Sequence, residues 1–416
     1  MAQVNLNIDE LKGFLTHIIS TNRMLQEKNN KPVSVEVVGD SGIGKTSTIL
    51  QVAEELNLDL VKVNLAQIEE LGDLVGFSTK EYQMFREVPA KQAEAINYKA
   101  SSIDKIAEAE TSTKKVGQWV DTEAVKHLLD KGWQLTGKKR TTYCPPEWIA
   151  DKKAGGILLL DDWNRADGRF IQAIMELIDR QTYYSWKLPK DWHIVLTSNP
   201  DNGDYMVNSV DDAQRTRYIT ANLEFDVDCW AIWAEKEGID SRCINFLLRY
   251  PEMVTKQTNA RSITTFFNAI SSFDSFFKNL PMVQMIGEGS VGEAFASTFT
   301  TFINNKMDLL PSPQEIMHTS DDKEALRKLK SAIYTDDELQ VSISSLLATR
   351  LANYSIVHSQ SNTINDKFVT RLSEVILSDN FTMDNRYMMV RSIVTGNKQK
   401  FQKLLMNPEI IKFTLE

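Results

Sequence analysis

The segment GDSGIGKT, Gly39 to Thr46, constrains the fold of this chain more than any other stretch of its sequence. It matches the pattern G-x-x-x-x-G-K-[ST] in full, in which glycines let backbone N–H groups curve around phosphate oxygens. The β-branched run VSVEVV before it predicts a strand, and a helix is predicted from Lys45 to about Leu56. Strand, glycine loop and helix in this order predict a parallel α/β sheet with a phosphate site where the helix begins.

The residues of this loop are predicted to bind a nucleotide, and two of them have separate predicted roles. The Lys45 ammonium is expected to reach the β- and γ-phosphates, and the Thr46 hydroxyl is expected to ligate Mg²⁺. The remaining residues are assigned to the nucleotide-binding site as a group: Gly39, Asp40, Ser41, Gly42, Ile43, Gly44 and Ser47.

Two adjacent carboxylates follow a second apolar run, GILLL. The run is predicted to be a buried strand that ends at Asp161, and the carboxyl ends of parallel strands share one edge of a sheet. Asp161 is therefore predicted to hold Mg²⁺ through water, as this ion prefers. Asp162 is predicted to act as the base that positions the attacking water, and the alternative is a purely electrostatic role.

Hydrophobic patterns divide the rest of the chain. A helix is predicted over residues 8–28, further strands over 58–65 and 193–200, a helix over 168–180 and a hairpin or loop over 181–192. The predicted organisation is an α/β nucleotide-binding domain (1–225), an α-helical lid (226–309) and a further C-terminal helical region (310–416). Within the first, residues 68–150 are predicted to be an insertion that is mostly helical, with GKKRTTY as a solvated loop.

Composition excludes several other classes of protein. The net charge of -9 disfavours a general polyanion binder, and no apolar run approaches the roughly 20 residues that span a bilayer. The three cysteines, Cys144, Cys229 and Cys243, are widely spaced, and the five histidines form no metal-ligand pattern. We therefore expect a cytoplasmic protein with reduced thiols, no membrane segment and no structural zinc site.

With these residues together, the chain resembles the AAA+ ATPases and, within them, the MoxR-type family. That family continues its acidic strand as Asp-Glu-hydrophobic-Asn-Arg-Ala, and DDWNRA, Asp161 to Ala166, reproduces this except at Asp162. An Asp is one methylene shorter than the Glu, which moves the carboxylate back by roughly 1 Å. TSNP places Asn199 where the family has its sensor 1 residue. Trp163 is interpreted as a core side chain.

The resemblance also implies residues that sense the nucleotide from further along the chain. DDAQRTRY resembles the segment that carries the arginine finger, which implies Arg217 in that role and Arg215 as the alternative. NARSITTF resembles the lid segment in which Arg261 is sensor 2. The family further implies ATP and Mg²⁺ as cofactors, a homo-hexameric ring, and chaperone-like remodelling of a protein partner, such as a von Willebrand factor A-domain protein.

Two other functions stay open. A nucleic-acid-directed NTPase of McrB type carries a similar Asn-Arg-Ala segment, and the basic cluster Lys138–Arg140 with Trp133 and Tyr143 would be its contact. A nucleotide-gated switch would bind ATP and assemble with slow turnover. The choice of ATP over GTP rests on the resemblance, because no base-reading motif is visible in the sequence.

Overall fold

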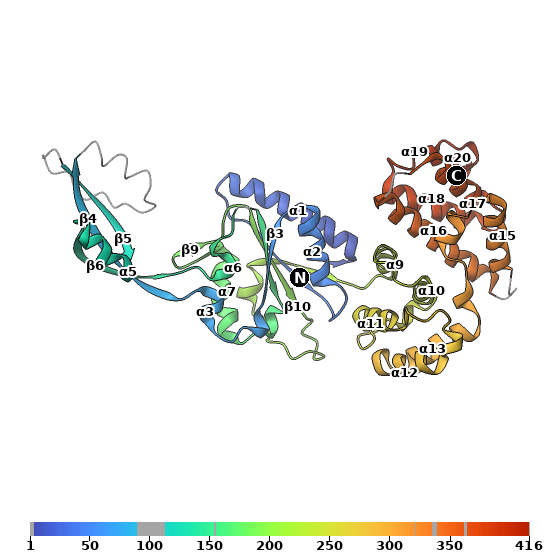
Figure 1. Cartoon of the computed structure of the whole chain (residues 1–416), viewed down its shortest axis with the longest axis horizontal. Helices are drawn as coiled ribbons and strands as arrows, with labels where there is room; N and C mark the ends of the chain where they lie inside the picture. The colour runs from blue at the N-terminus through green and yellow to red at the C-terminus, as the bar shows by residue number, and fades with distance from the viewer. Residues whose placement is uncertain are drawn as a thin grey trace. The chain divides into compact units, whose positions relative to one another are not determined.

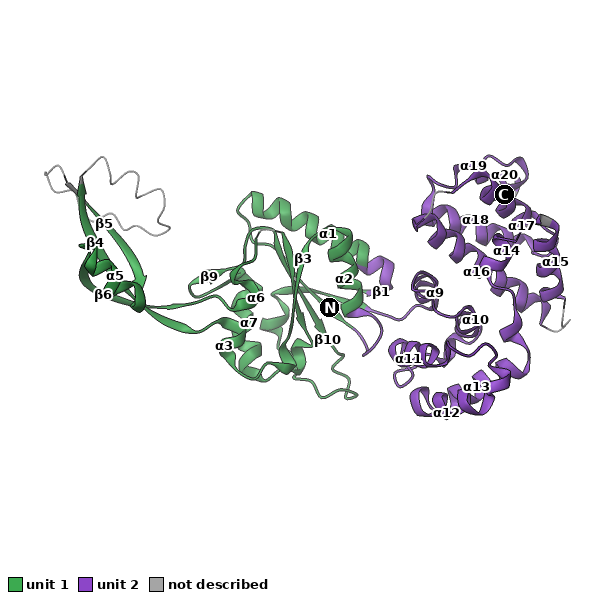
Figure 2. Ribbon diagram, viewed as in Figure 1, with its two compact units in different colours: residues 1–4, 12–38, 46–222 green, residues 5–11, 39–45, 223–416 purple. Residues whose placement is uncertain are grey.

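The computed structural model describes residues 4–89, 113–153, 155–319, 321–334, 339–361 and 364–415. The chain divides into two compact units, which are shown in Figure 2. Unit 1 consists of residues 1–4, 12–38 and 46–222, and unit 2 consists of residues 5–11, 39–45 and 223–416. Residues 39–45 of the glycine loop therefore belong to unit 2. The boundary that the sequence predicts between lid and C-terminal region stays a prediction.

Unit 1 is built on a parallel sheet, visible in Figure 1. Five of its strands follow the order β11-β2-β10-β7-β3, and every pair along this order is parallel. The strands are β2 (Ser34–Val38), β3 (Asp59–Asn64), β7 (Gly156–Asp161), β10 (Trp192–Ser198) and β11 (Tyr218–Leu223). The four strands that the sequence predicts are confirmed within one or two residues. Strand β11 was not predicted, because its exposed and buried residues do not alternate.

Helices cover this sheet because apolar side chains repeat along one face of each. In α7 (Gly168–Arg180), Phe170, Ile171 and Ile174 pack into one core with Leu158 and Leu160 of β7. The predicted hairpin is present as β8 (Thr182–Tyr183) and β9 (Trp186–Lys187). Further helical elements before residue 216, outside the β4–β6 region, are α1 (Ile8–Glu27), α2 (Lys45–Glu55), η1 (Leu65–Gln67), α3 (Leu71–Val75), α6 (Glu147–Ala150), η2 (Trp163–Arg165) and α8 (Asp212–Arg215).

The insertion differs from its prediction. Between the short helices α3 and α6, its described part is a three-stranded antiparallel sheet in the order β5-β4-β6 with one nine-residue helix, and residues 90–112 lie outside the described chain. These elements are β4 (Ser78–Pro89), β5 (Thr113–Asp121), α5 (Thr122–Asp130) and β6 (Gln134–Tyr143). For the described residues, the prediction of a mostly helical insertion is wrong. Polar residues stand on both faces of strand β6, which removes the period-2 signal there.

Unit 2 is helical beyond residue 223, as predicted, and one apolar core runs through it. Five phenylalanines of this core, among them Phe246 and Phe299, pack edge to face. The helices are α9 (Val227–Lys236), α10 (Ser241–Arg249), α11 (Ala260–Ile270), α12 (Leu280–Val291), α13 (Glu293–Asn304), α14 (Pro313–Met317), α15 (Asp322–Ile333), α16 (Gln340–Ser361), α17 (Asp366–Leu377), α18 (Met383–Asn397), α19 (Gln402–Leu405) and α20 (Pro408–Leu415). Strand β1 (Asn5–Leu6) and three short 3-10 turns, η3 (Pro251–Met253), η4 (Phe277–Asn279) and η5 (Met307–Leu309), complete the unit.

Candidate functional site

The glycine loop joins the end of β2 to the start of α2 and leaves no room for side chains at two positions. Gly42 has φ +77°, and a Cβ there would lie 2.4 Å from Oδ1 of Asn259. A Cβ at Gly39 would lie 2.8 Å from the carbonyl oxygen of Leu223. Lys45 is buried, and its Nζ donates to the carbonyl oxygens of Gly39 at 2.6 Å and Asp40 at 3.0 Å. The loop is therefore a close-packed backbone cradle with one ammonium folded against it.

Arg261 stands in the first turn of α11, beside this loop. Its Cβ lies 3.2 Å from the position that a Cβ at Gly42 would take. The helix is capped by Asn259, whose side chain accepts a hydrogen bond from the N–H of Ser262 at 3.1 Å. Both contacts lie within unit 2. The role of Arg261 as sensor 2 stays a prediction.

Asp161, at the end of β7, is the most connected carboxylate of the site. Its Oδ1 accepts hydrogen bonds from the hydroxyls of Thr46 at 2.9 Å and Thr197 at 2.6 Å. Its Oδ2 lies 2.8 Å from Nζ of Lys62, on β3. Burial raises the pKa of the Asp161 carboxyl, but the hydrogen bonds from Lys62, Thr197 and Thr46 outweigh burial and hold that pKa below its usual value. Asp161 is therefore ionised at neutral pH.

Asp162 has an unusual backbone conformation. Its φ of 52° and ψ of 37° lie in the left-handed region, which Asp and Asn enter more readily than most residues. The backbone N–H donates to Oγ1 of Thr197 at 3.0 Å. The carboxylate, 30% exposed, accepts a hydrogen bond at Oδ1 from Nδ2 of Asn199 at 3.3 Å. The second acid and the sensor 1 candidate therefore face the same point at the carboxyl end of the sheet.

Asn164, for which no role is predicted from the sequence, holds the backbone of Asn199. Its Nδ2 donates to the carbonyl oxygen of Asn199 at 2.8 Å, and its Oδ1 accepts from the N–H of Asn199 at 3.3 Å. Both side chains are buried. Lys62 and Thr197 were also missed, because contacts between neighbouring strands carry no sequence spacing; for Asn164, the only signal was its place in the DDWNRA segment.

The arginine-finger candidates lie where α8 leads into β11. Arg217 is half-buried, and its Nη1 donates to the carbonyl oxygen of Ala213 at 2.7 Å, whereas Arg215 is exposed. A hydrogen bond from Lys31, together with the charge of Arg217, lowers the pKa of the Asp179 carboxyl on α7. A role in the site of a neighbouring subunit stays a prediction for Arg217.

The basic cluster is part of strand β6 and not a loop, so that part of its prediction is wrong, but its cations Lys138–Arg140 are exposed to solvent as predicted. Arg140 lies 2.7 Å from Oε2 of Glu81 and 4.4 Å from the ring centroid of Trp119, and Lys139 lies over the ring of Tyr82. These cross-strand pairs explain how a run of cations is tolerated in β6, and they engage part of the charge that nucleic acid would need. Trp163, in contrast, has no exposed surface and is a core residue, as predicted.

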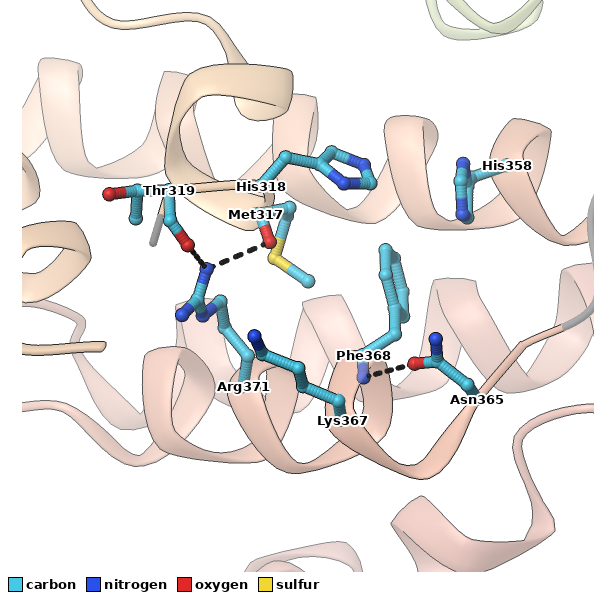
Figure 3. Close-up of a pocket in the computed structure, with 8 residues that line it drawn as sticks. All are labelled: Met317, His318, Thr319, His358, Asn365, Lys367, Phe368 and Arg371. Atoms are coloured by element: carbon cyan, nitrogen blue, oxygen red, sulfur yellow. Dashed lines mark hydrogen bonds between the residues drawn. The ribbon is translucent and has the colours of Figure 1, made fainter. Parts of the chain in front are cut away.

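A separate cavity of about 150 Å³ lies within the C-terminal helices, shown in Figure 3. Nη1 of Arg371 donates there to the carbonyl oxygens of Met317 and Thr319, and the rings of His358 and Phe368 stack with centroids 4.8 Å apart. The lining residues are Met317, His318, Thr319, His358, Asn365, Lys367, Phe368 and Arg371. The cavity shares none of the residues predicted for the nucleotide site.

The described residues hold neither a cluster of metal-ligating side chains nor a helix suited to a membrane. They contain no group of three or more His, Cys, Asp or Glu side chains that could hold a metal ion. No helix in the described ranges combines the length and the apolar composition that crossing a membrane requires.

The strand order and the site together define a class of fold. The order β11-β2-β10-β7-β3, a glycine loop after β2 and an acid pair at the end of β7 form an α/β P-loop sheet of the AAA+ type, followed by helices.

The comparisons with known proteins add little to this. No protein-family model matches the sequence, and no curated protein matches it. Two solved structures of RuvB mutants from Thermotoga maritima align over 88% of this chain. The first is 11% identical, is covered over 97% and has a TM-score of 0.34. The second is 10% identical, is covered over 90% and has a TM-score of 0.32. Structural similarity at this level is too low to support a fold or a function. The fold class therefore rests on the strand order and the glycine loop.

Proposed function

We propose that this chain is an AAA+ ATPase that binds ATP with Mg²⁺, hydrolyses it in an oligomeric ring, and uses the cycle to remodel a protein partner. The observation that carries the proposal is the contact between Asp162 and Asn199 beside Asp161. A protein that only binds nucleotide needs the loop and one metal-associated acid. A second acid held by a buried amide is what positioning of a water requires.

The residues present fit Mg²⁺. The hydroxyl of Thr46 and the carboxylate of Asp161 are hard oxygen donors, and they meet at 2.9 Å. When bound, Mg²⁺ supplies positive charge that neutralises the phosphates. Lys45 binds and orients the β- and γ-phosphates by exchanging its two loop carbonyls for phosphate oxygens, and Asp162 accepts a proton from the water that Asn199 helps to orient.

Within the AAA+ ATPases, we propose that the chain is of the MoxR type. It rests on the DDWNRA segment, in which Asn164 holds Asn199, and on the resemblance of the segments around Arg217 and Arg261. A homo-hexamer with nucleotide at each subunit interface, and a partner such as a von Willebrand factor A-domain protein, belong to this proposal. A nucleic-acid motor is disfavoured because Arg140 and Lys139 are already engaged within their own sheet.

Phosphate release from ATP tests the proposal. The purified full-length chain should release phosphate only when Mg²⁺ is present. Lys45→Ala should reduce the rate at least tenfold, because it removes the positive charge that stabilises the transferred phosphoryl group. Lys152→Ala is the matched control, because it removes a partly exposed lysine that pairs with Asp59. No release by the wild type under any assembly condition would refute hydrolysis, and equal loss in both variants would refute the role of Lys45.

Subunit mixing tests the ring. Arg217→Ala keeps its own acids and lacks the finger, whereas Asp162→Asn keeps the finger and lacks the base. If the finger acts on a neighbouring subunit, a mixture of the two inactive variants contains interfaces with a complete site, and activity returns. A mixture as inactive as its components would contradict a shared interface.

A further inference from the structure

Strand β2, which leads into the glycine loop, carries one charged residue at its centre. Glu36 lies between Val35 and Val37 and is only 6% exposed. Moving a carboxylate out of water is costly unless hydrogen bonds compensate it. Among the described residues no lysine or arginine forms an ion pair with Glu36, so neutral donors hold the charge.

Three donors converge on this carboxylate from three other segments. Nε1 of Trp163 and Oγ of Ser198 both donate to Oε1, at 2.9 and 2.8 Å. Oγ1 of Thr220, directly opposite Glu36 in the sheet register, donates to Oε2 at 3.1 Å. Hydrogen bonds to an ionised acceptor are roughly twice as strong as neutral ones. One buried group therefore joins β2, η2, β10 and β11.

Two of these donors are chain neighbours of the proposed hydrolytic residues. Trp163 directly follows Asp162, and Ser198 directly precedes Asn199. Trp163 and Ser198 both donate to the same oxygen of Glu36. This shared acceptor links the residues next to Asp162 and Asn199, whose side chains are 3.3 Å apart. The indole is fully buried, so a turn of Trp163 would move the backbone of Asp162.

Tyr218 of β11 packs against one of these donors. The hydroxyl of Tyr218 is buried without a hydrogen-bond partner among the described residues, and the Tyr218 ring packs edge to face on Trp163 with centroids 5.8 Å apart. Burial, and next the charge of Glu36, raise the pKa of the Tyr218 phenol, so this side chain stays neutral.

We propose that Glu36 is a positioning residue for hydrolysis: through Trp163 and Ser198 it sets the separation of Asp162 and Asn199. The inference rests on the proposed function. It assigns Glu36 no contact with nucleotide or water, so its loss should lower kcat and leave nucleotide affinity unchanged. A misplacement of about 1 Å at a catalytic group costs on the order of 10²-fold in rate.

Three substitutions separate positioning from stability. Glu36→Gln keeps the size and one acceptor oxygen but removes the charge, Trp163→Phe removes the indole N–H, and Ser198→Ala removes the hydroxyl. Ser34→Ala is the matched control: it removes a buried hydrogen bond of the same strand, 3.0 Å to the carbonyl oxygen of Ile178, away from the acids. Each variant is assayed for kcat, KM, ADP affinity and melting temperature.

We expect the first three variants to lose about tenfold to a hundredfold in kcat, with KM and ADP affinity within about threefold of wild type. Combining Glu36→Gln with Trp163→Phe should add little further loss, because both act through one oxygen. Ser34→Ala should lower the melting temperature and leave kcat unchanged. Wild-type kcat in Glu36→Gln and Trp163→Phe, or an equal loss in Ser34→Ala, would overturn the inference. Absence of turnover in the wild type would instead overturn the proposed function.

Discussion

Nδ2 of Asn199 donates a hydrogen bond of 3.3 Å to Oδ1 of Asp162, across 37 residues of sequence. The contact joins the ends of β10 and β7, two neighbouring parallel strands whose register pairs Leu196 with Leu160. The short Asp162 side chain therefore has a defined partner, and its left-handed backbone is one that Asp tolerates. Asp162, where the resemblance implies Glu, thus fits the local backbone. The substitution alone does not indicate an inactive site.

The first prediction concerns the glycine loop. Gly42→Ala should lower nucleotide affinity at least tenfold, because φ +77° is strained for alanine and its Cβ would meet Asn259 at 2.4 Å. Gly13→Ala is the control, since Gly13 lies within α1 with nothing within 4 Å of the added Cβ. It should stabilise the chain by about 0.5–1 kcal/mol. Fluorescent ADP titration and thermal unfolding measure both effects. Equal affinities would contradict the packing described for this loop.

The second prediction concerns the buried ion pair of unit 2. Arg350 is 1% exposed and binds Glu235 at 2.7 Å and Oδ1 of Asn245 at 2.6 Å. Arg350→Ala leaves Glu235 without its partner, so the free energy of unfolding should fall by about 3–5 kcal/mol.

Denaturant unfolding followed by tryptophan fluorescence measures this change. The control is Lys328→Ala, which breaks an exposed pair with Glu324 and should change stability by less than about 1 kcal/mol. Similar effects in both variants would show that the buried pair does not hold α16 to α9.

The third prediction concerns thiol reactivity at pH 8, which follows the thiolate fraction. Cys144 is exposed and should react quickly with a thiol reagent. Burial, and next the nearby Asp9 carboxylate, raise the pKa of the Cys229 thiol to about 12, and burial raises that of Cys243 well above its usual value. A raised thiol pKa keeps the group protonated, so these two should react slowly.

Counting modified thiols tests this arrangement. The native chain should show one fast thiol, the Cys144→Ser variant none, and the denatured chain three. Two or more fast thiols in the native chain would contradict the raised thiol pKa of Cys229 or of Cys243.

The fourth prediction concerns the finger. Arg217→Ala should lower kcat by about 10³–10⁵-fold while nucleotide stays bound, the range known for arginines that stabilise a transferred phosphoryl group. Arg215→Ala, on the exposed side of α8, is the matched control and should keep most of its activity. Unchanged turnover in Arg217→Ala would exclude this residue, and the reverse result would move the role to Arg215.

The sequence predicted the elements whose signal is local. The glycine spacing of the loop and the unbroken apolar run before Asp161 each predict one structure, because backbone geometry and burial act over a few adjacent residues. The sheet of the insertion could not be predicted, since Lys139 and Arg140 are stabilised by Tyr82, Trp119 and Glu81 from other strands. Pairing of that kind leaves no periodicity.

The same limit applies within the site. The sequence indicated Asp161, Asp162 and Asn199. Each of them lies at, or directly after, the end of a strand that its apolar run predicts. Lys62, Asn164 and Glu36 were missed because their importance lies in contacts across strands and turns, with Asp161, Asn199 and Trp163 respectively. Glu36 in particular interrupts a β-branched strand without disturbing its pattern, so only its buried position distinguishes it.

Phosphate release by Asp162→Asn, measured beside wild type at saturating Mg²⁺ and ATP, tests the central claim most directly. Asn tolerates the left-handed backbone and keeps an oxygen for Asn199, so the variant removes the base and, with it, only the 4.0 Å ion pair to Arg165 among the described ion pairs. The account predicts normal ATP binding and a rate lower by about 10²–10⁴-fold, the usual contribution of a general base. Hydrolysis as fast as wild type would contradict it.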